Sequence, residues 1–460
     1  MPSPFNSINI ASKALSAFQR GLDVVGHNIA NVGTKGYNRQ IVSYGATNPS
    51  QFWSMRALSL GTGVAISSIA RAHDGFVQKR FQGVQAELGR FSTLSTALSQ
   101  VEAIYNEPGA NGIAAALDRF FNSWSSLSAN PGTPAAQLEV QQSGIELARR
   151  IRRAFEEVVA TEKALEGQIT ATMGEIDKIT TRIDKLNKEI TAASATGAIP
   201  NDLLDQRDLA IEELSRITDI QTYSQPDGSI SVYAGALTLV DRGGARPYPQ
   251  TFDAATYTVS DGLNSYAVPT GTLFGSMEAL NRMAANRASL DSLADGLREG
   301  VNALFRTATN SYGETNLPFF NETAIPPTTG AGDFDLAANL KSDASRIGHG
   351  TSGAPGDGAL AQAIAALREQ PMTGLGGSTY HDFYSGVLVD LARSIESANT
   401  SRGTQEALAI QIDQQRQAIS GVSLDEEMAE MLRLQRSYQA AAKALSIFDQ
   451  VTEDLLTMLR

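Results

Sequence analysis

The sequence has 460 residues and a mass of 48.9 kDa, enough for roughly two to four domains. Its 37 basic and 49 acidic side chains give a net charge of −12, which argues against a nucleic-acid-binding protein, because such proteins usually carry a basic face. A hydrophobic content of 42% with 19% charged residues excludes a disordered chain, and no apolar run approaches the ~18 residues that span a bilayer.

The N-terminal segment carries a long apolar stripe with alternating steps of three and four residues, which predicts a coiled-coil helix. The stripe consists of Ile8, Ala11, Leu15, Phe18, Leu22, Val25, Ile29 and Val32. Gly33 and Gly36 follow it, and glycine tolerates the positive φ that often ends a helix. We therefore expect one helix that ends near Val32.

The middle of the chain has several long helical patterns with short breaks, which indicate a bundle. Similar stripes occupy 91–105 and 151–190, and apolar positions with helical spacing continue through 275–309. Four arginines between 149 and 153 have glutamates three or four residues away, which predicts a salt-bridged helix surface.

One acidic pair in this helical region has the residue types of a glycosidase site. Asp205 and Asp208 lie three residues apart beside Arg207. Two carboxylates could in principle serve such chemistry, but the neighbouring arginine favours a solvated ionic face of a helix.

The residues from 218 to 275 have the alternating pattern of short strands. A hairpin is predicted across 221–233, with its turn at Pro226-Asp227-Gly228. Further strands are expected at 236–240 and 257–259, and Asp261-Gly262 is a candidate turn. From about 311 to 379 the chain is rich in Gly, Pro, Thr and Ala, and only 360–368 has a helical pattern.

The C-terminal segment repeats the stripe of the N-terminal one. Helix is expected from Tyr380 onward with a break at Ser420-Gly421, and Ser423 with Glu426 forms a candidate capping box for the last helix. The stripe consists of Met431, Leu434, Tyr438, Ala441, Leu445, Phe448, Thr452, Leu455 and Leu459.

A lone helix with a narrow apolar stripe is not stable in water, so each terminal stripe needs a partner. The two stripes have the same period and therefore suit each other, within one chain or between neighbouring subunits. The alternative is that both are ordinary core helices of a globular bundle. Helices that need a neighbour would become ordered on assembly.

Signals for catalysis are missing from the sequence. It has no cysteine and only four histidines, which leaves few candidate metal ligands or acid–base groups. Gly-Lys, G-x-S-x-G and H-x-x-x-H do not occur. We therefore expect no enzyme activity, no catalytic, cofactor-binding or metal site and no cofactor.

The residues 26–40 read GHNIANVGTKGYNRQ. This segment resembles the N-terminal motif of flagellar axial proteins of the rod and hook, and most closely that of the hook-associated protein 1 family. The matching positions include Asn28, Asn31, Thr34, Gly36, Tyr37 and Arg39. By spacing alone, the amides of Asn28 and Asn31 could cap the preceding helix or contact a neighbouring subunit, and Tyr37 and Arg39 could pack locally or lie at an interface.

The resemblance continues along the chain. Residues 111–131 are similar to the helical segment of that family, 186–214 carry its L-N-x-x-I motif, and 421–459 resemble its C-terminal signature. The segment 218–379 resembles nothing that can be placed.

The resemblance implies a mainly α fold, with long terminal helices in a coiled-coil domain, a helical bundle domain and a smaller β-rich or loop-rich insertion. The expected terminal assembly domain comprises 1–45 and 415–460; the helical domain comprises 46–217, 276–312 and 380–414; 218–275 is the β-rich insertion and 313–379 the loop-rich one.

The implied role is a structural junction between the hook and the filament, assembled through the terminal helices. The N-terminal assembly residues would be Ile8, Leu15, Phe18, Leu22, Val25 and Ile29. The C-terminal ones, which an export chaperone would also mask, would be Met431, Leu434, Tyr438, Leu445, Phe448, Leu455 and Leu459. Implied partners are copies of the chain, the hook protein, a second junction protein and the filament, with neither nucleic acid nor membrane.

The first residues lack a signal peptide, so the resemblance implies export through the flagellar channel to an extracellular location. Two alternatives remain open. The chain could be another axial component, such as a hook or distal-rod protein, or an enzyme such as a wall hydrolase with its site in 218–379.

Overall fold

The structure is a computed structural model, which describes residues 4–52, 58–105, 107, 109, 112–322, 330–352, 354 and 356–458. Its chain is mainly helical with small antiparallel sheets, which confirms the predicted fold class. Two compact units form: unit 1 from Met1–Ala86, Glu175–Tyr248 and Gln405–Arg460, and unit 2 from Glu87–Gly174 and Pro249–Thr404. The expected domain limits stay a prediction.

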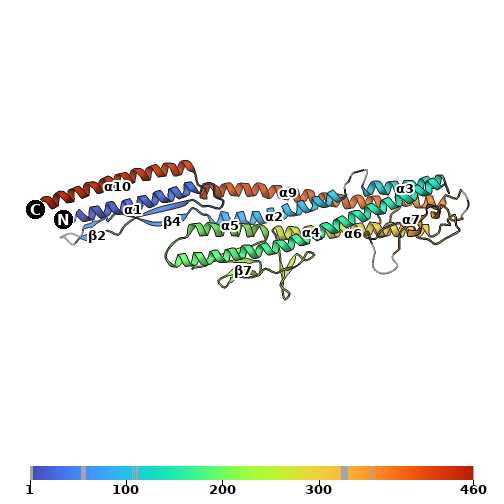
Figure 1. Ribbon diagram of the computed structural model, residues 1–460, viewed down its shortest axis with the longest axis horizontal. Coiled ribbons are helices and arrows are strands. Elements are labelled where there is room, and N and C mark those ends of the chain that lie inside the picture. The colour runs from blue at the N-terminus through green and yellow to red at the C-terminus, as the bar shows by residue number, and fades with distance from the viewer. Residues whose placement is uncertain are drawn as a thin grey trace. The chain divides into compact units, whose positions relative to one another are not determined.

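Unit 1 contains both terminal helices. Helices α1 (Pro4–Ala30) and α10 (Leu424–Met458) lie side by side, with both chain ends at the same end of the pair (Figure 1). The two helices are therefore antiparallel.

Four strands that the sequence analysis does not predict follow α1. Strand β1 (Gln40–Ala46) pairs with β4 (Val64–Arg71), and β2 (Ser50–Phe52) pairs with β3 (Leu58–Leu60), both antiparallel. The register of β1 and β4 shifts between Ser43 and Tyr44, which is a β-bulge.

The rest of unit 1 includes α5 (Asn201–Ile217) and a four-stranded antiparallel sheet. Its strands are β5 (Gln221–Ser224), β6 (Ile230–Ala234), β7 (Leu237–Asp241) and β8 (Gly244–Ala245). The predicted hairpin is confirmed: Gly228 has φ 82° in the β5–β6 turn, and the Asp227 carboxylate accepts from Ser229 N at 3.0 Å. Val232 of β6 and Val240 of β7, which are paired in the register, are both buried.

The boundary between the units falls within α2 (Gly75–Tyr105), α4 (Pro134–Ala195) and α9 (Tyr380–Ser420). Helix α4 has 62 residues, and its predicted stripe is buried on one face. Near its start, Arg153 Nε lies 2.8 Å from Glu157, and Arg149 and Arg150 both contact Glu146. The predicted salt-bridged surface is confirmed.

Unit 2 is built around α3 (Ile113–Ala129) and α6 (Thr272–Phe305), with the short α8 (Ala359–Ala366) against both. An aromatic cluster forms its centre: the Phe319 ring lies 5.3 Å from Trp124 and 5.3 Å from Phe305, and all three side chains are buried. The loop-rich segment thus contributes aromatic side chains to the core of the helices.

The remaining elements of unit 2 are short. They are β9 (Thr251–Asp253), β10 (Thr258–Ser260), β11 (Ser265–Ala267), α7 (Ala338–Ser342), η1 (Ala344–Arg346), η2 (Leu367–Glu369) and η3 (Thr373–Leu375). Asp261-Gly262 forms the predicted turn between β10 and β11, where the Asp261 carboxylate accepts from Leu263 N and Asn264 N.

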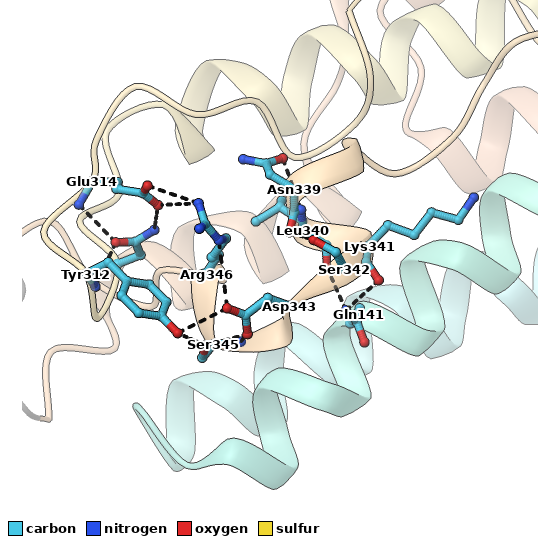
Figure 2. A network of polar contacts seen from close by, with 11 residues as sticks. Gln141, Tyr312, Glu314, Asn339, Leu340, Lys341, Ser342, Asp343, Ser345 and Arg346 are labelled. Atoms are coloured by element: carbon cyan, nitrogen blue, oxygen red, sulfur yellow. Dashed lines mark hydrogen bonds and ion pairs between the residues drawn. The ribbon is translucent and has the colours of Figure 1, made fainter.

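Polar side chains hold the loop-rich segment in place (Figure 2). Gln141 of α4 donates to the Leu340 carbonyl at 2.6 Å, which ties α7 to the long helix. The Arg346 guanidinium donates to both oxygens of Glu314 at 2.9 Å and lies 5.3 Å from the centre of the Tyr312 ring. A segment with few apolar residues is thereby fixed by charge-assisted hydrogen bonds.

Candidate assembly site at the paired terminal helices

Two contacts define how α1 and α10 face each other. Asn28 Nδ2 donates to Glu427 Oε2 at 3.0 Å. Seven residues earlier in α1 and seven later in α10, a Cβ built on Gly21 would lie 3.2 Å from Leu434 Cδ1. Equal steps of seven residues in opposite directions are the antiparallel version of a heptad register.

The predicted N-terminal stripe lies largely on the covered side of α1. Val25 is buried, as is Ala11. Five positions are half-buried: Ile8, Leu15, Phe18, Leu22 and Ile29. Val32 lies beyond the end of α1 and is exposed, because the helix ends at Ala30 rather than at Val32.

The predicted C-terminal stripe is covered less completely. Leu434 is buried, whereas Met431, Leu445 and Phe448 are half-buried. Tyr438 and Leu455 are exposed. Leu459 lies outside the described residues.

Helix α10 also exposes two apolar patches that the sequence analysis does not identify. Leu424, Met428 and Leu432 form the elbow patch, at the start of the helix. Ile447, Val451 and Met458 form the distal patch, near its C-terminal end. The exposed fractions of the six side chains range from 46 to 84%. At 100° per residue, Met428 and Val451 point about 140° apart, so the patches lie on different flanks of α10.

The N-terminal motif forms a polar cluster around Asn28, which is almost fully buried at 1% exposure. Its Oδ1 accepts from Tyr37 OH at 2.7 Å and from Gln40 N at 2.9 Å. Its Nδ2 donates to Gln40 O and Glu427 Oε2, both at 3.0 Å. Asn28 therefore does not cap α1 but joins α1, β1 and α10.

Arg39 contacts the break between α9 and α10. Its guanidinium lies 2.8 Å from Glu426 and 2.6 Å from the buried Glu427 Oε1. The second contact is an ion pair without hydrogen-bond alignment, since that oxygen has no hydrogen-bond partner among the described residues. The predicted break at Ser420-Gly421 is confirmed, and a Cβ on Gly421 would meet the Gln417 carbonyl.

The start of α10 agrees only in part with the predicted capping box. Glu426 N donates to Ser423 Oγ at 3.5 Å, so Ser423 does cap the helix. The Glu426 side chain instead pairs with Arg39, which the capping-box pattern cannot reveal because the partner is distant in sequence.

The other motif residues shape the turn after α1. Asn31 Nδ2 donates to the His27 carbonyl at 3.0 Å, so this asparagine caps the helix, and Thr34 Oγ1 donates to Asn31 Oδ1. Gly36 has φ 81°, and a Cβ there would lie 3.3 Å from Leu209 Cβ. Glycine allows both this backbone and the close approach of α5.

Tyr37 is held as a hydrogen-bond donor. Burial raises the pKa of its hydroxyl, and the carboxylates of Asp202, Asp205 and Glu427 raise it further. Its ring meets the His27 ring edge-on at 5.5 Å. The phenol thus stays protonated at neutral pH and continues to donate to Asn28.

The prediction of a solvated face around Arg207 is wrong. Asp205 is 5% exposed; its Oδ2 accepts from Asn38 N, and its Oδ1 lies 2.7 Å from Arg71. Burial raises the pKa of Asp205, although the bonds from Arg71 and Asn38 oppose this rise. Arg207 is itself buried and donates to the Gly228 carbonyl at 2.7 Å. These partners come from distant segments, so local spacing gives no sign of them.

A polar cleft of about 720 Å³ opens beside this cluster. Its lining includes Lys35, Arg39, Glu212, Asp413 and Arg416. Arg416 pairs with both Glu212 and Asp413 at 2.7 Å. The charge of Arg416 is therefore used in ion pairs within the fold. Among the described residues no group of His, Asp and Glu could hold a metal ion, and no helix is long and apolar enough to cross a membrane.

Three family models match separate parts of the chain. They are the flagellar hook-associated protein FlgK helical domain over 98–320, the flagella basal body rod protein over 8–38 and the flagellar basal body rod FlgEFG protein C-terminal over 413–458. The models for the two chain ends cover much of α1 and α10.

Relatives match the chain over nearly its full length. Flagellar hook-associated protein 1 of Bacillus subtilis is 28% identical over 99% of this chain and 98% of its own. Those of Salmonella typhimurium and Escherichia coli are 23% and 22% identical over 98% of this chain and 99% of theirs. The flagellar hook junction protein FlgK from Burkholderia pseudomallei has a similar fold, with a TM-score of 0.62 at 16% identity over 74% of this chain and all of that one.

The order of these matches is the order of the elements described above: a rod-type N-terminal helix, the FlgK helical domain and a rod-type C-terminal helix. The N-terminal motif and the C-terminal signature that first indicated this resemblance lie in the paired helices and the cluster that joins them. The chain belongs to the flagellar hook-associated protein 1 (FlgK) family, the structural proteins of the hook–filament junction in the bacterial flagellum.

Proposed function

We propose that this chain joins hook to filament by means of α10, whose two exposed patches contact neighbouring subunits while α1 covers the side between them. The observation that carries the proposal is the placement of apolar side chains on two flanks of one helix. A contact that uses different surfaces on the two partners generates rings or helical tubes rather than closed dimers.

The proposal can be tested in cells that lack the chain. Met428→Asp and Val451→Asp each place a charge in one patch and should leave hooks without filaments, because a carboxylate cannot be buried there without a partner. Gln435→Asp and Gln450→Asp are matched controls at exposed polar positions of α10 and should restore filaments. Normal filaments with both patch variants would refute the role of the patches.

Amounts of exported variant must be measured in the same cells. A variant that is exported but leaves filament subunits shed in the medium has lost assembly. A variant retained in the cytoplasm has instead lost export.

The specific partners and the location belong to the same proposal. Axial neighbours would be the hook protein on one side and a second junction protein with the filament on the other. The chain would reach this extracellular place through the flagellar export channel.

An export chaperone would bind α10 before assembly and cover its exposed apolar side chains. Deletion of 424–460 should abolish this binding. Retention of the complex by the truncated chain would place the chaperone site elsewhere.

The alternative of a hook or distal-rod component is less well supported. The two rod-type models match only the chain ends, whereas the FlgK helical model matches 98–320. The position of the chain in purified hook–basal bodies would distinguish the two roles.

A further inference from the structure

Apolar stripes with a seven-residue repeat do not by themselves determine how two helices align. The side of α1 that meets α10 carries Gly21 and Asn28, which are seven residues apart, and the buried Ala17 and Val24, which share this face by helical spacing and are also seven apart. In α10 the same interval recurs through the predicted stripe. A slide of one helix by one heptad, about 10 Å, would again place apolar residues opposite each other. The connection at 31–39 spans more than this distance when extended, so it could absorb such a slide.

We infer that Asn28, Arg39 and Glu427 form a register lock, which selects one alignment of α1 with α10. Glu427 is 1% exposed, so its carboxylate needs partners inside the interface. In the observed alignment it meets both the Asn28 amide and the Arg39 guanidinium. This inference concerns pairing within one chain and goes beyond the proposed contacts between subunits.

The orientation of Asn28 makes the lock specific. Both the N–H and the carbonyl of Gln40 bond to the Asn28 side chain, so the backbone of β1 fixes which way the amide faces. One N–H of Nδ2 is then left, and it is directed at Glu427. Asn28 is therefore a positioning residue whose chemistry matches an acceptor on α10.

A slide by one heptad would separate these groups. In one direction Asn28 would face the position of Leu434, and in the other Glu427 would face Gly21, which has no side-chain donor. Either slide would leave buried polar groups without partners, which is strongly unfavourable. Gly21 adds a steric element to the same alignment, since a Cβ there would crowd both Leu434 and the Tyr44 hydroxyl.

The absence of cysteine allows a direct test in the full-length chain. Ala14 and Ala441 continue the observed register by one more heptad, and both are half-buried. A disulfide between Ala14→Cys and Ala441→Cys reports this register. A disulfide between Ala14→Cys and Phe448→Cys reports a slide, because about 10 Å along the helix otherwise separates that pair by more than a disulfide can bridge.

With the lock intact, oxidation should yield the first disulfide almost alone. Asn28→Asp places two carboxylates in contact and should raise the yield of the second disulfide about tenfold. Glu427→Gln, which keeps the shape but removes the charge, should raise it less. Glu430→Gln is the matched control, since Glu430 pairs on the exposed surface with Arg433, and it should change neither yield.

Unchanged yields in Asn28→Asp and Glu427→Gln, with helix content preserved by circular dichroism, would overturn the inference. Loss of both disulfides in these variants would overturn it as well, because the cluster would then hold the helices together without selecting their alignment.

Discussion

Arg39 and Ser420 are joined by a backbone hydrogen bond of 2.9 Å, in which the Arg39 N–H donates to the Ser420 carbonyl. That carbonyl is at the end of α9, and the guanidinium of the same arginine pairs with the first turn of α10. One residue of the N-terminal motif thus donates a hydrogen bond to a terminal carbonyl of α9 and pairs with carboxylates in the first turn of α10.

Arg39→Ala should destabilise the break between α9 and α10. It removes the cation beside the buried Glu427 carboxylate, at a cost of about 2 to 4 kcal/mol in local stability. Faster hydrogen exchange of the amides in 420–434 would measure it. Arg433→Ala removes an exposed pair with Glu430 and should cost less than about 1 kcal/mol. Equal exchange in the two variants would contradict the prediction.

Gly21→Ala should weaken the pairing of α1 with α10, because the new methyl group would contact Leu434 and Tyr44. The expected loss is about 1 to 3 kcal/mol. A Cβ on Gly26 in the same helix would meet none of the described atoms within 4 Å, so Gly26→Ala should stabilise the helix by up to about 1 kcal/mol. Hydrogen exchange in α1 would compare the two, and a stabilising Gly21→Ala would show that this crossing is not close.

The carboxylate of Asp357 provides a pH-dependent prediction. Hydrogen bonds, first from the Ser352 side chain and then from backbone N–H groups that include that of Ala359, lower its pKa to about 2. Its folded pKa lies below the ordinary value of 3.8, so its contribution to stability is complete above that value and is lost as the pH falls toward 2.

The carboxyl carbon of Asp357 should therefore titrate in NMR with a midpoint of about 2. Ser352→Ala should move that midpoint upward. A midpoint that the substitution leaves unchanged would mean that the backbone donors alone hold the charge.

Helix content offers a test of coupled ordering. We predict that the isolated chain has less helix by circular dichroism than the assembled form, because the terminal helices are covered fully only by neighbours. Equal helicity in the two states would argue against ordering on assembly.

Much of the fold follows from local pattern, and much of the site does not. The terminal stripes and the break at Ser420-Gly421 were predictable because heptad spacing and helix breakers act within a few residues. Strands β1 and β4 were not predicted, since their stability depends on pairing with each other and on α1. The burial of Asp205 and Glu427 depends on Asn38 and Asn28, which are far away in sequence.

The motif residues show the same division. The amide of Asn31 does what its position near a helix end suggests, whereas Asn28 has the same residue type three positions earlier and a different task. The two asparagines differ because α10, which is distant in sequence, packs against Asn28 and gives its amide a partner in Glu427.

The two exposed patches of α10 also affect the purified chain. Because α10 has apolar side chains on more than one side, part of its surface stays hydrophobic after α1 has covered the facing side. The purified chain should therefore aggregate as its concentration is raised, and mild detergent should keep it monodisperse.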